Sequence, residues 1–228
     1  AFDSIIRRDN KLFNSLINSG LNLNHQIFDN ETLLHCAIES HNVEAAKMLI
    51  DNGCSIDART LNFQDSPINL AIQEEQEEIF QMLVSKGADI EIENFEGETP
   101  IFTAIRYGNV KFVEKLISLK ANVNKVNKGG NTPLHIAMML HQEEIGKILL
   151  KNGSDVKKGE GNSLRIAQQA SQIDLASQVR DKNPELAKDP LPNYFIGSLM
   201  LKEPLPVPDS DILPLVTVKV KTNSINDS

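Results

Sequence analysis

One short motif returns along this chain at a nearly constant interval. Its clearest copies are TLLHCA (residues 32–37), TPIFTA (99–104) and TPLHIA (132–137), with a weaker copy, SPINLA (66–71), and a degraded one, NSLRIA (162–167). The closing alanines are separated by 34, 33, 33 and 30 residues, at Ala37, Ala71, Ala104, Ala137 and Ala167. A fixed period of this length is typical of repeat proteins, in which each unit buries its apolar face against its neighbours. The period therefore predicts a stack of similar units rather than one central core.

A second series of markers runs out of phase with this motif. A glycine follows an apolar helical stretch in four repeats, at Gly20, Gly53, Gly87 and Gly153. Lys120 takes the corresponding place in the remaining repeat. A glycine just past a helix end adopts a positive φ without a Cβ clash and closes the last turn. The two series together predict a unit made of two helices followed by a short extended finger.

The motif residues have local physical roles. Proline suits the first turn of a helix, where its missing N–H is no loss. A threonine hydroxyl just before a helix can accept a hydrogen bond from the first turn, and this capping role is expected for Thr32, Thr99 and Thr132. The alanine that closes each copy is small where two helices must approach closely. Each motif copy is therefore expected to begin the first helix of a pair.

The two ends of the array are expected to differ from its middle. Residues 1–20 read as a helix pair without its opening finger, and the chain begins partway through a repeat, so we expect a segment of a longer polypeptide. Residues 162–181 read as a last pair rich in polar side chains, as a capping unit requires. The array then comprises about six helix pairs in a first domain, residues 1–183.

Residues 184–228 form a different, proline-rich segment. Seven of the ten prolines lie from Pro184 to Pro214, which excludes a continued helix. Residues 215–221 alternate apolar and polar side chains like a strand, and residues 193–201 are too apolar for a solvated linker. We expect an extended tail that docks on the array or belongs to a further domain.

From residue 1 to about 181 the chain resembles the ankyrin repeat family, on the TPLHxA-like motif and the glycine markers quoted above. The resemblance implies an all-α solenoid with short β-hairpin fingers set at right angles to paired antiparallel helices. It also implies a concave groove, formed by the inner helices and finger tips, that typically binds another protein. The second copy carries Asn69 and the third Phe102 in place of the motif histidine, and the second finger has one extra residue. The tail has no match within the family.

Charge and composition restrict the partner and the compartment. The net charge of −8 opposes binding to a phosphate backbone, so we expect no nucleic acid and favour a protein partner, with a basic patch as one option. The alternative is that the charge only keeps the array soluble. No apolar run approaches the roughly 18 residues that a membrane-spanning helix needs. The two cysteines are expected to be free thiols, which favours a cytoplasmic location.

No residue cluster predicts chemistry. His35 and His135 are the motif histidines, which the resemblance assigns to backbone hydrogen bonds between repeats. His41 and His141 share one repeat phase at the bend between helices, too far apart to hold one metal ion. Cys36 and His35 are sequence neighbours on a helix, so their side chains point about 100° apart. No phosphate-binding glycine loop or zinc spacing is present, and we expect neither an enzyme nor a cofactor or metal.

Repeat phase predicts the partner-binding residues. Two and three residues after each motif alanine, an inner helix turns toward the groove. The finger tips carry apolar side chains at or near one equivalent position of the repeat. The predicted contacts from the helices are Glu39, Gln73, Glu74, Arg106, Tyr107, Met139 and Leu140, and those from the fingers are Phe28, Phe63 and Phe95. Tyr and Arg are over-represented among binding hot spots, which centres the footprint on the third and fourth full repeats. Two alternatives stay open: the finger tips pack on one another, and Glu74 belongs to a solvated acidic bend.

Asparagine hydroxylation is a further hypothesis. Asn24 and Asn124 each lie eight residues after a leucine, a pattern that resembles the site of asparaginyl hydroxylation in ankyrin repeats. Asn22 and Asn122 stand where that pattern usually has an acid.

The sequence leaves two alternatives to an endogenous protein-binding scaffold. One is a substrate-targeting module of a larger enzyme. The other is a secreted bacterial effector that acts in the cytosol of a host cell. The 22 asparagines, typical of an AT-rich genome, agree with this alternative.

Overall fold

A pair of short antiparallel helices forms the repeating unit of the structure, a computed structural model that describes residues 1–62, 64–159, 166 and 173–185. The first helices of the pairs are here called inner helices and the second ones outer helices. The inner helices are α1 (Phe2–Ile6), α3 (Leu33–Glu39), α5 (Pro67–Gln73), α7 (Pro100–Arg106) and α9 (Pro133–Met139). The outer helices are α2 (Asn10–Asn18), α4 (Val43–Asp51), α6 (Glu77–Ser85), α8 (Val110–Ser118), α10 (Glu143–Lys151) and α12 (Ile173–Lys182). The predicted all-α repeat stack is confirmed.

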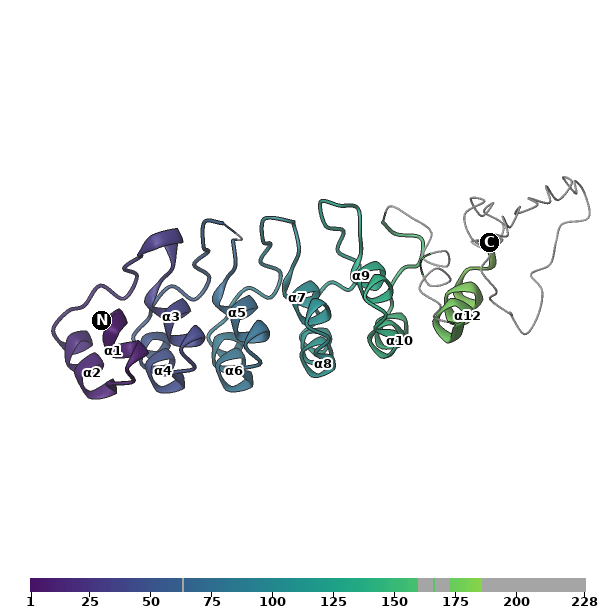
Figure 1. The fold of residues 1–228 in the computed structure, drawn as a ribbon. Coiled ribbons are helices and arrows are strands. Elements are labelled where there is room, and N and C mark those ends of the chain that lie inside the picture. The colour runs from purple at the N-terminus through teal and green to yellow at the C-terminus, as the bar shows by residue number, and fades with distance from the viewer. Residues whose placement is uncertain (63, 160–165, 167–172, 186–228) are drawn as a thin grey trace, which may run out of the picture. The chain divides into compact units, whose positions relative to one another are not determined.

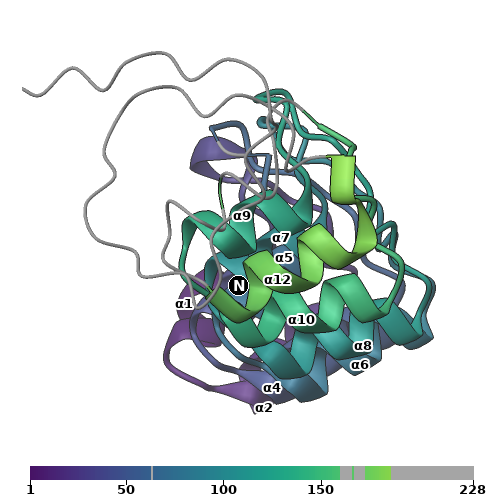
Figure 2. The ribbon, with the colours of Figure 1, turned by 90° about the vertical axis from the view of Figure 1, so that its right-hand side faces the viewer.

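The pairs stack in chain order, and each inner helix packs on the next inner helix (Figure 1). The outer helices do the same, with α6 and α8 joined by the Phe80 and Phe112 rings, whose centres are 5.0 Å apart. Viewed along the stack, α9, α7 and α5 form one row and α10, α8 and α6 a second row (Figure 2). The fingers project from the inner-helix side (Figures 1 and 2). α12 packs on α10 as the outer helix of a sixth pair. The inner partner predicted for it, within residues 162–172, lies outside the described residues apart from Ile166.

The inner helices α3, α5, α7 and α9 are buried except at their last residues. Ala37, Ala71, Ala104 and Ala137 have no exposed surface, as expected for small residues where helices meet. The predicted threonine caps are confirmed only in part. Thr132 Oγ1 accepts a hydrogen bond from the His135 N–H at 3.3 Å, whereas Thr99 Oγ1 is buried without a partner. The prediction was wrong for Thr99, whose repeat has Phe102 in place of the motif histidine.

Left-handed backbone recurs in the fingers, at Asn30, Gln64, Gly97 and Gly130, and at two further places around the helices. After the outer helices the glycines take φ values of 78° to 91°, and Lys120 takes φ 70°, as its phase predicts. A left-handed residue also lies at the bend between the two helices of each of the first five pairs, and the glycine pattern did not predict it. These bend residues are Arg8, His41, Glu75, Gly108 and His141.

The fingers are tight turns. Their closing backbone hydrogen bonds run from Ile27 N–H to Glu31, from Asn94 N–H to Glu98 and from Asn127 N–H to Asn131, at 2.9 to 3.0 Å. The second finger closes from Thr60 N–H to Asp65 and is one residue longer, as predicted. In the described ranges the structure forms an isolated bridge, Gln26 with Thr32, and no strand, so the expected β-hairpins are reduced to their turns.

The tail predictions, including the strand at 215–221 and the apolar segment at 193–201, fall outside the described residues. Within the described part, no helix combines the length and apolar character needed to cross a bilayer. Cys36 and Cys54 are buried free thiols, and burial raises the pKa of Cys54 to about 11, which keeps it protonated at neutral pH.

Candidate protein-binding surface

The ends of the inner helices of the third and fourth repeats carry three large exposed apolar side chains. Tyr107 is 55% exposed, Met139 54% and Leu140 42%. Tyr107 and Leu140 are the C-terminal cap residues of α7 and α9, where each helix turns away from the core toward its bend. Because α7 and α9 pack side by side, these three residues lie on neighbouring elements. We call them the apolar cluster.

Arg106, next to Tyr107, forms an ion pair with another residue of this chain, Glu98. Its Nε and Nη2 donate to Glu98 Oε2 and Oε1 at 2.8 and 2.6 Å, and Asn127 Nδ2 donates to Oε1 at 2.8 Å. Glu98 is only 3% exposed and lies just before the cap residue Thr99. Sequence reasoning singled out Arg106 as a partner contact and missed this ion pair, although Arg106 itself stays exposed.

The positions equivalent to Glu98 and Arg106 also face each other in the first and second repeats. In the second repeat Gln73 hydrogen-bonds Asp65, which opposes the rise in the pKa of Asp65 caused by burial. In the first repeat the two positions hold Glu31 and Glu39. Burial, the charge of Glu39, a hydrogen bond with it and the charge of Asp29 raise the pKa of Glu31 to about 7.

Glu74 is half-buried and lies close to a basic side chain of the previous repeat. His41 Nε2 lies 3.2 Å from Glu74 Oε2. The neighbouring Glu77, on α6, is ion-paired with Lys111 and Lys115 on α8. The acidic run at 74–78 is therefore not only a solvated bend, because two of its carboxylates contact basic groups of adjacent repeats.

Two finger tips are exposed. Leu61 is 62% exposed and Phe95 57%. Lys128 of the next finger lies over the Phe95 ring, with Nζ 4.9 Å from the ring centre, and donates to the Phe95 carbonyl at 2.7 Å. Phe63 and the side chain of Phe28 lie outside the described residues. The apolar patch predicted across three fingers therefore stays a prediction.

The motif histidines have structural roles. Thr32 N–H donates to His35 Nδ1 at 3.2 Å, which leaves the proton on Nε2, 3.3 Å from the Asp65 carbonyl of the next repeat. Burial lowers the pKa of both His35 and His135. The described residues hold no group of three or more His, Cys, Asp or Glu side chains arranged for a metal ion.

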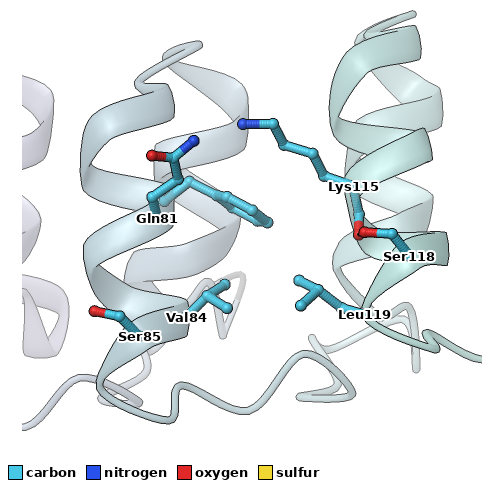
Figure 3. A pocket seen from close by; sticks show the side chains of 7 residues that line it. Gln81, Val84, Ser85, Lys115, Ser118 and Leu119 are labelled. Carbon is cyan, nitrogen blue, oxygen red and sulfur yellow. The ribbon is translucent and has the colours of Figure 1, made fainter.

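A pocket of about 280 Å³ lies between the outer helices α6 and α8 (Figure 3). Gln81, Val84 and Ser85 face Lys115, Ser118 and Leu119 across it (Figure 3). Small-molecule sites usually have about 300 Å³ or more and a few convergent polar groups. The Lys115 ammonium is already paired with Glu77, so the pocket has no free charge to orient a ligand.

Asn24 and Asn124 both hold the next repeat. Asn24 Oδ1 accepts from Ser55 N–H at 2.7 Å, and Asn124 Oδ1 accepts from Asp155 N–H at 2.7 Å. Asn124 Nδ2 also donates to the Gly153 carbonyl at 2.9 Å.

Curated relatives match parts of this chain. NF-kappa-B inhibitor alpha of Gallus gallus is 34% identical over 89 residues, which cover 37% of this chain and 28% of the relative. Transient receptor potential cation channel subfamily A member 1 of Homo sapiens is 25% identical over 181 residues, covering 74% of this chain and 16% of the channel. The chain thus spans less than a third of the length of either relative.

Solved structures match the fold. An ankyrin repeat domain from Acinetobacter baumannii AYE superposes with a TM-score of 0.72 at 27% identity, covering 78% of this chain and 94% of that one. The human ASB11 ankyrin repeat domain gives a TM-score of 0.66 at 23% identity and shows the fold alone, covering 80% and 82%. The family described as Ankyrin repeats (3 copies) matches residues 4–94 and 91–159. With the helix pairs and left-handed turns above, these matches show that the chain belongs to the ankyrin repeat family.

Proposed function

We propose that this chain is a protein-binding module whose partner docks on the inner-helix ends of the third and fourth repeats. Ankyrin repeats are in general protein–protein interaction modules. The observation that carries the proposal is the apolar cluster, Tyr107, Met139 and Leu140, exposed on adjacent inner helices. Exposed apolar groups gathered on one face commonly mark interaction sites, and Tyr is enriched among hot spots.

The structural role of these residues is small, which supports a binding role. The core beside them is formed by Ile105 and Met138, which are fully buried one or two positions earlier on the same helices. Arg106 adds a charge whose orientation Glu98 fixes, so little side-chain entropy is lost when a partner contacts its exposed part. In this proposal Phe95 and Phe63 form the rim of the partner-binding surface.

The experiment compares two double variants with a captured partner. The partner is isolated by affinity capture and identified by mass spectrometry, and its affinity is measured by calorimetry. Tyr107→Ala with Met139→Ala should cost roughly 2–4 kcal/mol of binding free energy and leave the melting curve unchanged. Leu12→Ala with Leu119→Ala, which removes two exposed apolar side chains at the outer helices α2 and α8, should leave affinity unchanged. Equal affinities for both variants would place the binding site elsewhere.

The wider setting follows as part of the same proposal. The chain acts without chemistry of its own, in the cytoplasm, as a scaffold. A targeting module within a longer polypeptide is the second candidate, favoured by the small share of the curated relatives that the chain spans. Delivery into a host cytosol is the third, and the bacterial source of one matching structure agrees with it.

A further inference from the structure

Two equivalent positions form a side-chain pair in successive repeats. One lies just before the cap of the inner helix and the other eight residues later, near the end of that helix. In the third repeat the pair is Glu98 with Arg106, and in the second it is Asp65 with Gln73. In both repeats a carboxylate receives hydrogen bonds from a donor that the helix end supplies.

In the first repeat the helix end supplies a second carboxyl group in place of an amide or a guanidinium. Glu39 stands where Arg106 stands in the third repeat, so Glu31 faces a second carboxylate rather than a guanidinium. The other charged group acting on Glu31 is Asp29, also acidic. The guanidinium of Arg8 donates to the carbonyl of Ser40, the residue after Glu39, at 3.1 Å. The hydrogen bond of this pair joins the two carboxyl groups to each other, and two facing carboxylates are electrostatically costly when both are ionised.

The third repeat shows which group binds a carboxylate at this position. The Glu98 carboxylate, at the position of Glu31, binds the planar guanidinium of Arg106 through both of its oxygens. Paired planar groups of this kind give the strongest and most directional ion pairs in proteins. A guanidinium from outside the chain can reach the first repeat, because Glu39 is exposed and Glu31 only half-buried.

Resting on the proposed function, we propose that the partner is an extended segment that places an arginine against Glu31 and Glu39 and apolar side chains on the apolar cluster. The acidic site, Glu31 and Glu39, lies at α3 and the cluster begins at α7, two inner helices further along the stack in Figure 1. Neighbouring helices lie roughly 8–10 Å apart, so the two sites are roughly 16–20 Å apart. An extended chain rises about 3.3 Å per residue, which sets the arginine about five to six residues from the apolar group.

The first test uses a displayed library of random 12-residue peptides selected on the whole chain. The expected consensus has one arginine and an apolar pair separated by about five to six residues. Selection on the variant Glu31→Gln with Glu39→Gln should keep the apolar pair and lose the arginine. An apolar consensus without arginine on both proteins would overturn the arginine site and leave the proposed function standing. A library with no enriched peptide would overturn both.

The second test measures the best peptide by fluorescence polarisation. Glu39→Arg recreates the Glu98–Arg106 arrangement and fills the site from within, so it should weaken binding by roughly 10-fold or more. Replacing the peptide arginine by citrulline, its neutral isostere, should cause a similar loss with the wild-type chain and none with Glu39→Arg.

The matched control is Glu44→Arg, which makes the same charge change on the exposed face of α4 in the same repeat. It should change affinity less than 3-fold, roughly the size of a screened surface charge effect. Equal losses for Glu39→Arg and Glu44→Arg would mean that net charge, not the acidic site, attracts the peptide. Loss with Tyr107→Ala and Met139→Ala, but none with Glu39→Arg, would refute the arginine site alone.

Discussion

Arg106 and Glu98 form a two-point ion pair that joins α7 to the finger before it, with Nε–Oε2 and Nη2–Oε1 distances of 2.8 and 2.6 Å. Glu98 is 3% exposed, and its carboxylate accepts hydrogen bonds from Arg106 and from the side-chain amide of Asn127. Arg106→Met should therefore destabilise the fold by about 1–3 kcal/mol, since it leaves a buried carboxylate with one donor. Urea denaturation followed by circular dichroism measures the change.

The control for that prediction removes the orphaned charge. Adding Glu98→Gln to Arg106→Met should recover part of the lost stability, because a neutral amide is cheaper to bury than an unpaired carboxylate. If the double variant is less stable than Arg106→Met, the charge of Glu98 is held by groups other than Arg106.

Asn69 is a buried amide whose nitrogen and oxygen both lack a hydrogen-bond partner. At the same position of the first repeat, His35 Nδ1 accepts the N–H of the cap residue Thr32. Asn69→His should restore this bond to the Ser66 N–H and stabilise the fold by about 1 kcal/mol. A denaturant midpoint that falls would show that the second repeat has no room for an imidazole, and His35→Asn is the reciprocal variant, expected to destabilise.

The sequence predicted the helix pairs and the finger turns because both recur with one period, and each repeat supports the reading of the others. It also predicted the left-handed backbone at Lys120, since phase alone assigns that position. The pairing of Glu98 with Arg106 was missed, because these residues lie on different elements, on either side of a helix start. The signal was nevertheless present: residues eight apart in the same phase change from Glu–Glu to Asp–Gln to Glu–Arg along the chain.

Lys120 carries a Cβ in a conformation that the other repeats assign to glycine, at φ 70°. A left-handed non-glycine residue costs roughly 1 kcal/mol, so Lys120→Gly should raise the free energy of unfolding by up to about 1 kcal/mol. Gly87→Ala is the reverse control. A Cβ at Gly87 meets no atom within 4 Å, so any loss there reports backbone strain alone. A lower midpoint for Lys120→Gly would contradict the prediction.

Glu31 should make the stability of the fold depend on pH. Its pKa of about 7 lies above the ordinary value near 4.3, because of burial and of the facing carboxylates of Glu39 and Asp29. The folded chain therefore binds more protons here than the unfolded chain, and this contribution to stability is lost as pH rises from about 5 through 7. Glu31→Gln should remove the loss, so the melting temperature of the variant should gain on that of the wild type between pH 5 and pH 8.

His35 and His135 change the stability with pH in the opposite direction, and both are present in the wild type and in Glu31→Gln. Burial lowers the pKa of His35 and His135, so their contribution to stability is lost as pH falls below about 6.5. The comparison therefore rests on the difference between variant and wild type at each pH. A difference that stays constant from pH 5 to 8 would show that Glu31 is ionised throughout.

Hydroxylation of Asn24 and Asn124 is the last prediction. A hydroxylase must take the asparagine out of its place in the finger. For Asn24 this breaks the side-chain hydrogen bond with the Ser55 N–H. For Asn124 it breaks two side-chain hydrogen bonds, one with the Asp155 N–H and one with the Gly153 carbonyl. Because two bonds resist the release of Asn124, Asn24 should be modified faster. Incubation with an asparaginyl hydroxylase followed by peptide mass spectrometry should show a gain of one oxygen, first on Asn24, and Asn24→Ala should abolish that peak alone. The absence of this gain on either residue would end the hypothesis, and a faster gain on Asn124 would show that the two side-chain bonds do not control access.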